Sequence, residues 1–130
     1  MLNITTDAPR QWLDITEHVA QALRATPIQE GACLVFSPHT TASVVVGEHW
    51  DPDVVRDLLA FLADRVPNTW PAWRHQEGNS AAHLLQALFG SSATVPVHQG
   101  ALALGRWQGI FLAEWDGPRT RQVYVQCLPA

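Results

Sequence analysis

Residues 31–67, GACLVFSPHTTASVVVGEHWDPDVVRDLLAFLADRVP, join two runs of β-branched residues to an amphipathic helix pattern. The runs GACLVFS and TASVVVGE predict two buried strands, with the polar triplet PHT crossing between them. In the helix, we expect Asp51 to cap the first turn, Pro52 to occupy the first helical position and Pro67 to end the helix. The stretch therefore indicates a domain that mixes sheet and helix. The apolar stripe of the helix consists of Val54, Val55, Leu58, Leu59 and Leu62.

Upstream of this stretch, the chain shows short alternating segments and one more helix signal. Residues 2–6 and 11–15 predict two strands joined by a turn at DAP. Thr16 is expected to cap a helix over residues 17–25, which ends at Pro27. This side therefore adds two strands and a helix.

Downstream, the chain carries a long loop, a helix signal and then a series of strands. Asn79 or Ser80 is expected to cap a helix that runs to Phe89 and closes at Gly90. The segments SATVPVH, GALAL, GRWQGIFLAEW and RQVYVQCL predict strands. Strands at both ends with helices between them indicate one compact α+β domain over residues 1–130. Its sheet is expected to be largely antiparallel or mixed, with two to three helices.

Composition limits the possible functions. The formal net charge of −4 argues against a sequence-independent nucleic-acid binder, and the eight basic residues are all arginine, which excludes lysine chemistry. No GxGxxG or P-loop motif is present, so no nucleotide cofactor is expected. With no signal peptide and no long apolar run, we expect a cytoplasmic domain that does not span a membrane. Cys33 and Cys127 lie in apolar stretches without a pairing motif and are expected to be buried free thiols.

Histidines supply the candidate chemical groups. His39 sits in the polar crossing, and His75 and His83 flank a Gly-Asn turn at the start of the last helix. Two imidazoles near a helix N-terminus suit a divalent metal or an anion, although a surface histidine and a helix-face histidine explain the spacing equally well. Glu48 ends its strand pointing inward by alternation, where it needs a partner, or it ends the strand in solvent.

The remaining polar and aromatic residues are less specific. Arg119 and Arg121 frame the last strands and suit a phosphorylated ligand if they border a pocket; otherwise they are solvated. Ser91 follows the helix-closing glycine and is explained by turn chemistry. Trp73 and Trp107 belong to the core or an interface, or form a wall for a flat ring.

Several blocks, taken in order, resemble a known family. They are HTTASVVVGE, the helix DPDVVRDLLAFLADRVP, H.EGNSAAHL, ALFGSSATVPV, GALALGRWQGIFLAEWDGPR and VYVQCL. Together they are similar to the YjbQ-like family, described as secondary thiamine-phosphate synthases. The resemblance implies a cytosolic α+β homotrimer that joins a pyrimidine methyl diphosphate to a thiazole phosphate and releases pyrophosphate.

The resemblance also implies site residues. Those of catalytic type are His39, Glu48, His75, Asn79 and His83, and those that bind substrate are Thr40, Gly78, Ser91, Trp107, Gln108 and Arg119. Two positions depart from the family pattern, which has Asn-Glu-Asn at residues 47–49 and an aspartate at Ala81.

We therefore expect His39, His75 and His83 to converge in one pocket, with Glu48 and Asn79 nearby. The histidines would hold zinc, or magnesium would enter with a diphosphate, and a small phosphorylated metabolite would be the partner. Two alternatives keep the pocket. One is a metal-assisted hydrolase of a phosphorylated or acylated metabolite, and the other is a non-catalytic trimer that binds such a metabolite.

Overall fold

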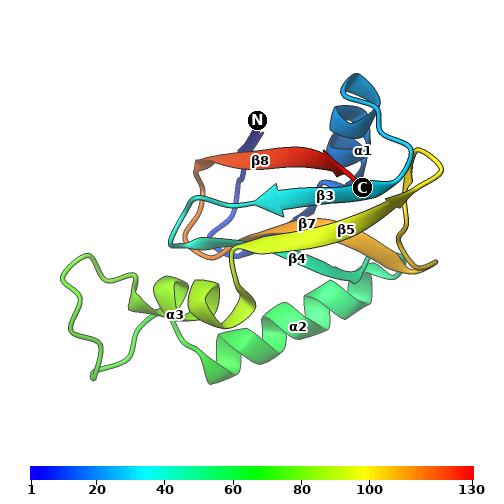
Figure 1. Ribbon diagram of the computed structural model, residues 1–130. Helices are drawn as coiled ribbons and strands as arrows, with labels where there is room; N and C mark the ends of the chain where they lie inside the picture. The colour runs from blue at the N-terminus through cyan, green and yellow to red at the C-terminus, as the bar shows by residue number, and fades with distance from the viewer.

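The computed structural model describes all residues from 1 to 130 and contains three helices and eight strands. No helix has the length and apolar character needed to cross a bilayer. The elements, coloured along the chain in Figure 1, are β1 (Leu2–Thr5), β2 (Gln11–Asp14), α1 (Thr16–Ala25), β3 (Gly31–Phe36), β4 (Ala42–Glu48), α2 (Pro52–Arg65), α3 (Ser80–Phe89), β5 (Ser92–His98), β6 (Ala101–Leu102), β7 (Gln108–Glu114) and β8 (Thr120–Pro129).

The strands form two sheets, not one. The larger has the order β1-β8-β3-β5-β6 and the smaller the order β2-β7-β4. Every pairing is antiparallel, which confirms the expected α+β class. In the small sheet, Ala42 pairs with Glu114 at one end of β4 and Glu48 pairs with Gln108 at the other. Glu114 and Glu48 therefore lie at opposite ends of the β4–β7 strand pair.

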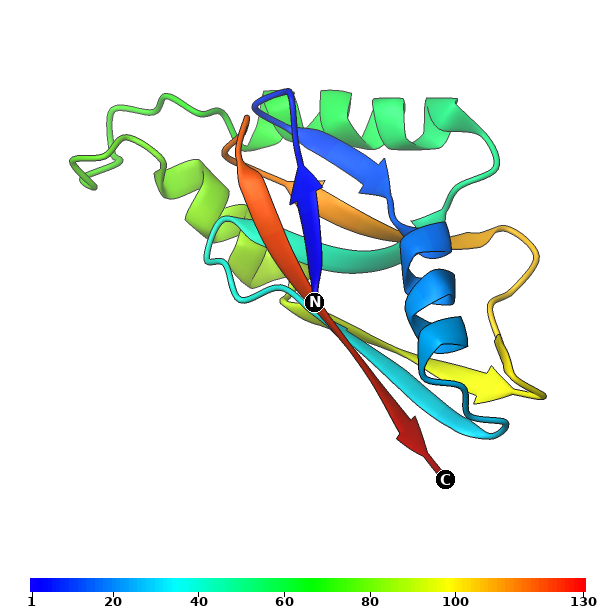
Figure 2. The same ribbon diagram turned by 90° about the horizontal axis from the view of Figure 1, so that it is seen from above.

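The main core lies between the two sheets, and helices close its open sides. Val35 and Val123 of the large sheet share one buried cluster with Val44 and Leu112 of the small sheet. Helix α1 adds Val19 to this cluster and stands at one end of the sheets, as Figure 2 shows. Burial of these apolar side chains is the main favourable contribution to folding.

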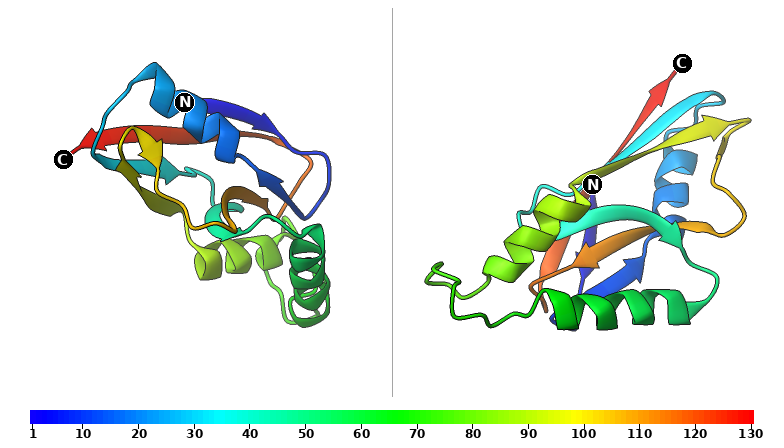
Figure 3. Two further views of the ribbon diagram at one scale, coloured as in Figure 1. Left: turned by 90° about the vertical axis from the view of Figure 1, so that its right-hand side faces the viewer. Right: turned by 90° about the horizontal axis from the view of Figure 1, so that it is seen from below.

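Helices α2 and α3 cover the other face of the small sheet, as both views of Figure 3 show. Leu62 of α2 and Leu85 of α3 pack in one cluster with Ala113 and Trp115 at the end of β7. The helical layer therefore fixes α3 against the end of β7, where the chain turns toward β8.

One of three expected helix caps is confirmed. The Asp51 side chain accepts a hydrogen bond from the Asp53 N–H at 2.9 Å. Thr16 was expected to cap α1, but the cap residue is Ile15, and the Thr16 hydroxyl bonds to the Asp14 carboxylate instead. Asn79 occupies the cap position of α3 but makes no capping bond, because its side chain is used elsewhere.

The two cysteines are free, as expected, but they face each other. Cys33 on β3 pairs directly with Cys127 on β8, and their Sγ atoms are 3.1 Å apart. Burial and the neighbouring thiol raise the pKa of Cys33 to about 12. Since the thiolate is the reactive form, Cys33 is not a nucleophile at neutral pH.

Candidate functional site

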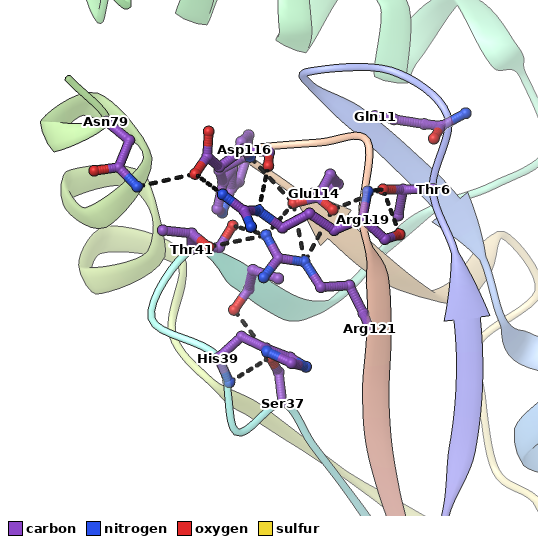
Figure 4. A network of polar contacts seen from close by, with 12 residues as sticks. Thr6, Gln11, Ser37, His39, Thr41, Asn79, Glu114, Asp116, Arg119 and Arg121 are labelled. Atoms are coloured by element: carbon purple, nitrogen blue, oxygen red, sulfur yellow. Dashed lines mark hydrogen bonds and ion pairs between the residues drawn. The ribbon is translucent and has the colours of Figure 1, made fainter. Parts of the chain in front are cut away.

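An ion pair lies inside the protein where β7 ends and β8 begins. Glu114 is 0% exposed and Arg121 is 4% exposed. Arg121 Nε donates to both carboxylate oxygens, at 2.9 and 3.2 Å, and its Nη2 contacts Oε2 as well. Because an unpaired buried charge is very costly, each group requires the other, and the pair is fixed in place (Figure 4).

Neighbouring groups complete the hydrogen bonds of this pair. The Thr6 hydroxyl donates to Glu114 Oε1 at 2.7 Å, and the Asp116 N–H donates to Oε2 at 3.1 Å. Arg121 Nη2 donates to Thr41 Oγ1 at 2.8 Å. Burial alone would raise the pKa of Glu114, but the hydrogen bonds from Arg121, Thr6 and the Asp116 N–H hold it below its usual value. The carboxylate therefore remains ionised at neutral pH.

A second set of polar contacts begins at Asp116, two residues after Glu114. Asn79 Nδ2 and Arg119 Nη2 both donate to Asp116 Oδ2, each at 2.9 Å. Asn79 Nδ2 also donates to Glu77 Oε2 at 3.1 Å. Burial would raise the pKa of Asp116, but the bonds from Asn79 and Arg119 lower it. Asn79 thus ties the start of α3 to the β7–β8 turn, which explains why it does not cap its helix.

His39 approaches from the loop between β3 and β4. Its Nε2 accepts the Gln122 backbone N–H at 2.9 Å, which requires the tautomer with the proton on Nδ1. Ser37 Oγ accepts the His39 N–H at 3.3 Å and supports the loop. Burial and the nearby Arg121 charge lower the pKa of His39. His39 is therefore neutral at physiological pH and presents Nδ1–H.

His75 and His83 approach from the other side of the site. Their ring centroids are 5.5 Å apart and the rings are nearly perpendicular, at 84°. His83 is in the first turns of α3, and His75 belongs to the loop before it, where Gly78 with φ of 78° allows the tight turn. The loop thus folds back onto α3 as expected and brings the two imidazoles into contact.

These groups line one open pocket with a volume of about 490 Å³ and no hydrophobic residue in its wall. The three histidines therefore share a pocket, in agreement with the expectation from the sequence. Its lining consists of Pro38, His39, Thr40, Thr41, His75, Glu77, Asn79, His83, Asp116, Arg119 and Arg121.

The donor set does not fit the expected metal ion. No three His, Cys, Asp or Glu side chains come together in a way that could hold a metal. His39 Nε2 is already used by the Gln122 N–H, and Asp116 by Asn79 and Arg119. The expected zinc-type site of His39, His75 and His83 is therefore not formed by this chain, and we derive no step through a metal.

Glu48 does not belong to this pocket. It lies six residues along β4 from Ala42, which corresponds to about 20 Å at the usual rise of a strand. There its carboxylate accepts the Asp51 N–H at 3.1 Å, close to an ion pair between His49 and Asp14 with 2.7 Å between Nδ1 and Oδ2. The expectation that Glu48 joins the histidines is wrong, because the antiparallel register carries it to the far end of the sheet.

Trp107 and Gln108 are also at the far end. Trp107 packs against Trp50 with ring centroids 5.3 Å apart, and Gln108 Oε1 accepts the Gly105 N–H at 2.8 Å. Ser91 accepts a hydrogen bond from Gln86 at 2.7 Å and lies outside the pocket lining. These three residues therefore have local roles in turns and surface packing.

Two further residues singled out in the sequence lie beside the pocket but not in it. Trp73 packs on Trp70 at 4.9 Å, and both line a separate apolar pocket with Leu84. Ala81, where the family pattern has an aspartate, is 1% exposed and does not line the polar pocket.

The sequence reasoning missed Glu114, Thr6 and Thr41. Glu114 is the one acid in the apolar run GIFLAEW, and such an acid needs a buried partner. That signal points to a buried ion pair, but the partner Arg121 is in the next strand and can be assigned only from the fold.

The chain matches a known protein family along its whole length. The model of the family described as UPF0047 protein YjbQ-like matches residues 1–130. This chain belongs to the YjbQ-like UPF0047 family. Its relatives include the UPF0047 protein YugU of Bacillus subtilis, 42% identical over 127 residues, which covers 98% of this chain and 96% of YugU.

Solved structures of family members agree with the fold. A YjbQ/UPF0047 family protein from Clostridium acetobutylicum superposes with a TM-score of 0.95 at 41% identity, covering 98% of each chain. The protein TT1486 from Thermus thermophilus gives a TM-score of 0.88 at 41% identity, covering 98% of this chain and 100% of that one. The names of these relatives state no reaction.

Proposed function

We propose that this protein binds a small phosphorylated metabolite in the polar pocket. The phosphate end of the metabolite leaves, and the remaining group is transferred to a second substrate. The observation that carries the proposal is the pocket itself: two arginines and three histidines lie in a wall without any hydrophobic residue. Arginine and histidine N–H groups are suited to phosphate oxygens, and a wall of this kind favours the charged end of a ligand over a ring.

The resemblance to the family specifies the reaction further. In a thiamine-phosphate-synthase-type reaction, the thiazole nitrogen forms a bond to the pyrimidine methylene carbon while the bond from that carbon to the diphosphate oxygen breaks. The protein has to hold the two partners in line and stabilise the charge that develops on the diphosphate. In this proposal Arg119 and the Nδ1–H of His39, which line the pocket, donate to the leaving group, and His75 or His83 gives it a proton.

Glu48 has no role in this mechanism, since it is at the other end of β4. A metal-assisted hydrolase is less well supported, because the chain forms no three-ligand set for the metal. A non-catalytic metabolite-binding protein would use the same pocket and differs only in showing no turnover.

The decisive experiment is complementation of a strain that lacks the dedicated thiamine-phosphate synthase. Wild type should restore growth without thiamine, and His83→Ala and Arg119→Ala should not, while all three accumulate to the same level. Purified protein should then release one pyrophosphate per thiamine phosphate formed. Ligand binding without coupling would establish the binding protein instead, and rescue by His83→Ala would separate the pocket from the activity.

We also infer that the protein acts in the cytoplasm as a homotrimer. The outer face of the large sheet carries no helix (Figures 1 and 3) and exposes Phe36, Tyr124 and Leu128 by 39%, 47% and 49%. Apolar patches of this kind are typical of subunit interfaces. Light scattering on the purified protein should give three times the chain mass, and Tyr124→Glu should reduce it to one.

A further inference from the structure

The polar pocket contains donors and acceptors that no protein group satisfies. Arg121 has five N–H donors, and Glu114 and Thr41 use those on Nε and Nη2. Nη1 makes no hydrogen bond. The buried side-chain atoms without a partner are Arg10 Nε, Trp12 Nε1 and Asn79 Oδ1, so Arg121 Nη1 is not closed off from solvent and reaches the pocket that Arg121 lines. A charged side chain that is 96% buried yet keeps one open nitrogen is aimed at a ligand.

The same pocket lining also carries acceptors. Asp116 Oδ2 takes the bonds from Asn79 and Arg119, whereas Oδ1 accepts none, and the side chain is 27% exposed. Asn79 Oδ1 is buried without any partner. The pKa of Asp116 is held low, so its free oxygen can only accept. A ligand that fills this pocket must therefore donate as well as accept hydrogen bonds.

The charges of the pocket point the same way. The charged and titratable groups are Arg119 and Arg121, the carboxylates Glu77, Asp116 and, beneath the floor, Glu114, and the imidazoles of His39, His75 and His83. Apart from the imidazoles, two cations face three carboxylates. The site therefore offers arginine N–H donors without an excess of positive charge. This charge balance disfavours a fully deprotonated phosphate group.

We propose that the pocket selects a phosphate group that keeps one proton, with Arg121 Nη1 and Arg119 donating to its unprotonated oxygens and Asp116 Oδ1 accepting the hydrogen bond of its P–OH. This rests on the proposed function in requiring a phosphorylated ligand, and it names the ionic form that is bound. Sulfate and sulfonate have the same shape but no proton. Their oxygen would therefore face the Asp116 carboxylate without a hydrogen bond, and the two negatively charged oxygens would repel each other.

The test compares inorganic phosphate with sulfate by calorimetry at about pH 8 and constant ionic strength. At that pH phosphate is the hydrogen-phosphate dianion, so the two probes have equal charge and differ by one O–H. One hydrogen bond to a charged acceptor should give phosphate an advantage of about tenfold or more. A simple phosphate monoester, with its second pKa near 6, should lose affinity above about pH 6 more steeply than inorganic phosphate does. Protonation of the histidines affects all three anions, and sulfate measures that contribution by itself.

The variant Asp116→Asn supplies the specific control, because its amide can donate to sulfate. We expect the preference for phosphate to fall to about threefold or less, as the unfavourable contact becomes a neutral hydrogen bond. Asp14→Asn, at the far end of the sheet, is the matched variant and should keep the wild-type ratio.

Equal binding of phosphate and sulfate by wild type overturns this inference and leaves the proposed function standing. An unchanged ratio in a folded Asp116→Asn protein also overturns it. If neither anion binds at millimolar concentration while complementation succeeds, the ionic form named here is wrong. If Asp116→Asn does not fold, the wild-type ratio and the pH profile of the monoester still decide.

Discussion

The two ends of the β4–β7 strand pair carry similar polar residues in very different surroundings. At the end where Ala42 meets Glu114, Glu114 and Arg121 are buried and bonded to each other, and one arginine nitrogen is left open to the pocket. At the end where Glu48 meets Gln108, the side chains of His49 and Asp14 form an ion pair that is 27% and 43% exposed. The same kinds of residue are therefore a fixed framework at one end and a surface contact at the other.

The difference shows that burial, and not residue type, sets the importance of a polar group. An exposed pair is screened by water and contributes at most about 1 kcal/mol, whereas removing one partner of a buried pair leaves an uncompensated charge. The buried pair also fixes the Asp116 turn and the open nitrogen of Arg121, so the pocket forms at this end.

The largest expected effect is on stability. Glu114→Ala should lower the free energy of unfolding by about 3–5 kcal/mol, because Arg121 remains buried without a partner. His49→Ala, which removes the exposed pair and keeps the bonds from Thr16 to Asp14, should lower it by about 1 kcal/mol or less. Urea denaturation followed by tryptophan fluorescence measures both. Equal losses in the two variants would remove the distinction between the ends.

The next effect is on activity. His83→Ala should reduce the coupling rate by about 100-fold, since proton transfer by a positioned imidazole contributes about that much or more. Glu48→Ala should leave the rate within about twofold of wild type, because a loss of function at 20 Å would need transmitted distortion. Steady-state pyrophosphate release is the measurement. A large loss in Glu48→Ala would mean that the far end takes part in the reaction.

A smaller effect is expected from Asn79. Asn79→Ala removes a hydrogen bond to the charged Asp116 and should cost about 1–2 kcal/mol at neutral pH. The depressed pKa of Asp116 means that its contribution is present above its ordinary value of 3.8 and is lost as the pH falls below it. The variant should therefore show less loss of stability on acidification, and an NMR titration should place Asp116 nearer 3.8. An unshifted Asp116 would show that Arg119 alone lowers its pKa.

The smallest effect concerns His39. Its pKa is lowered below 6.5, so its stabilising contribution is complete above that value and is lost as the pH falls toward the folded-state pKa. Protonation removes the Nε2 acceptor of the Gln122 N–H. Unfolding measured from about pH 7 to 5 should show a decline of under about 1 kcal/mol that His39→Asn abolishes and the exposed His18→Asn retains. A decline that persists in His39→Asn would have to come from another group.

Much of the fold could be read from the sequence. The strand at 31–36, the helix after Asp51 and the helix after Asn79 follow from local signals, because periodicity and caps act over a few residues. The division into two sheets could not be read, since strand pairing depends on contacts across the whole chain. The Cys33–Cys127 contact was hidden for the same reason, because its partners are 94 positions apart in the sequence.

The site divides in the same way. The sequence by itself determined the turn at Gly78 and the helix start that follows it, because these signals are local. The ordered blocks indicated the family, and with it the prediction that His39, His75 and His83 share a pocket. Only the tertiary structure decided that Asp116 and Arg121 line the same pocket and that Glu48 and Trp107 do not. Ala42 and Glu48 are six residues apart and therefore lie at opposite ends of β4. The buried charges of Glu114 and Arg121 become partners only when β7 and β8 are in place.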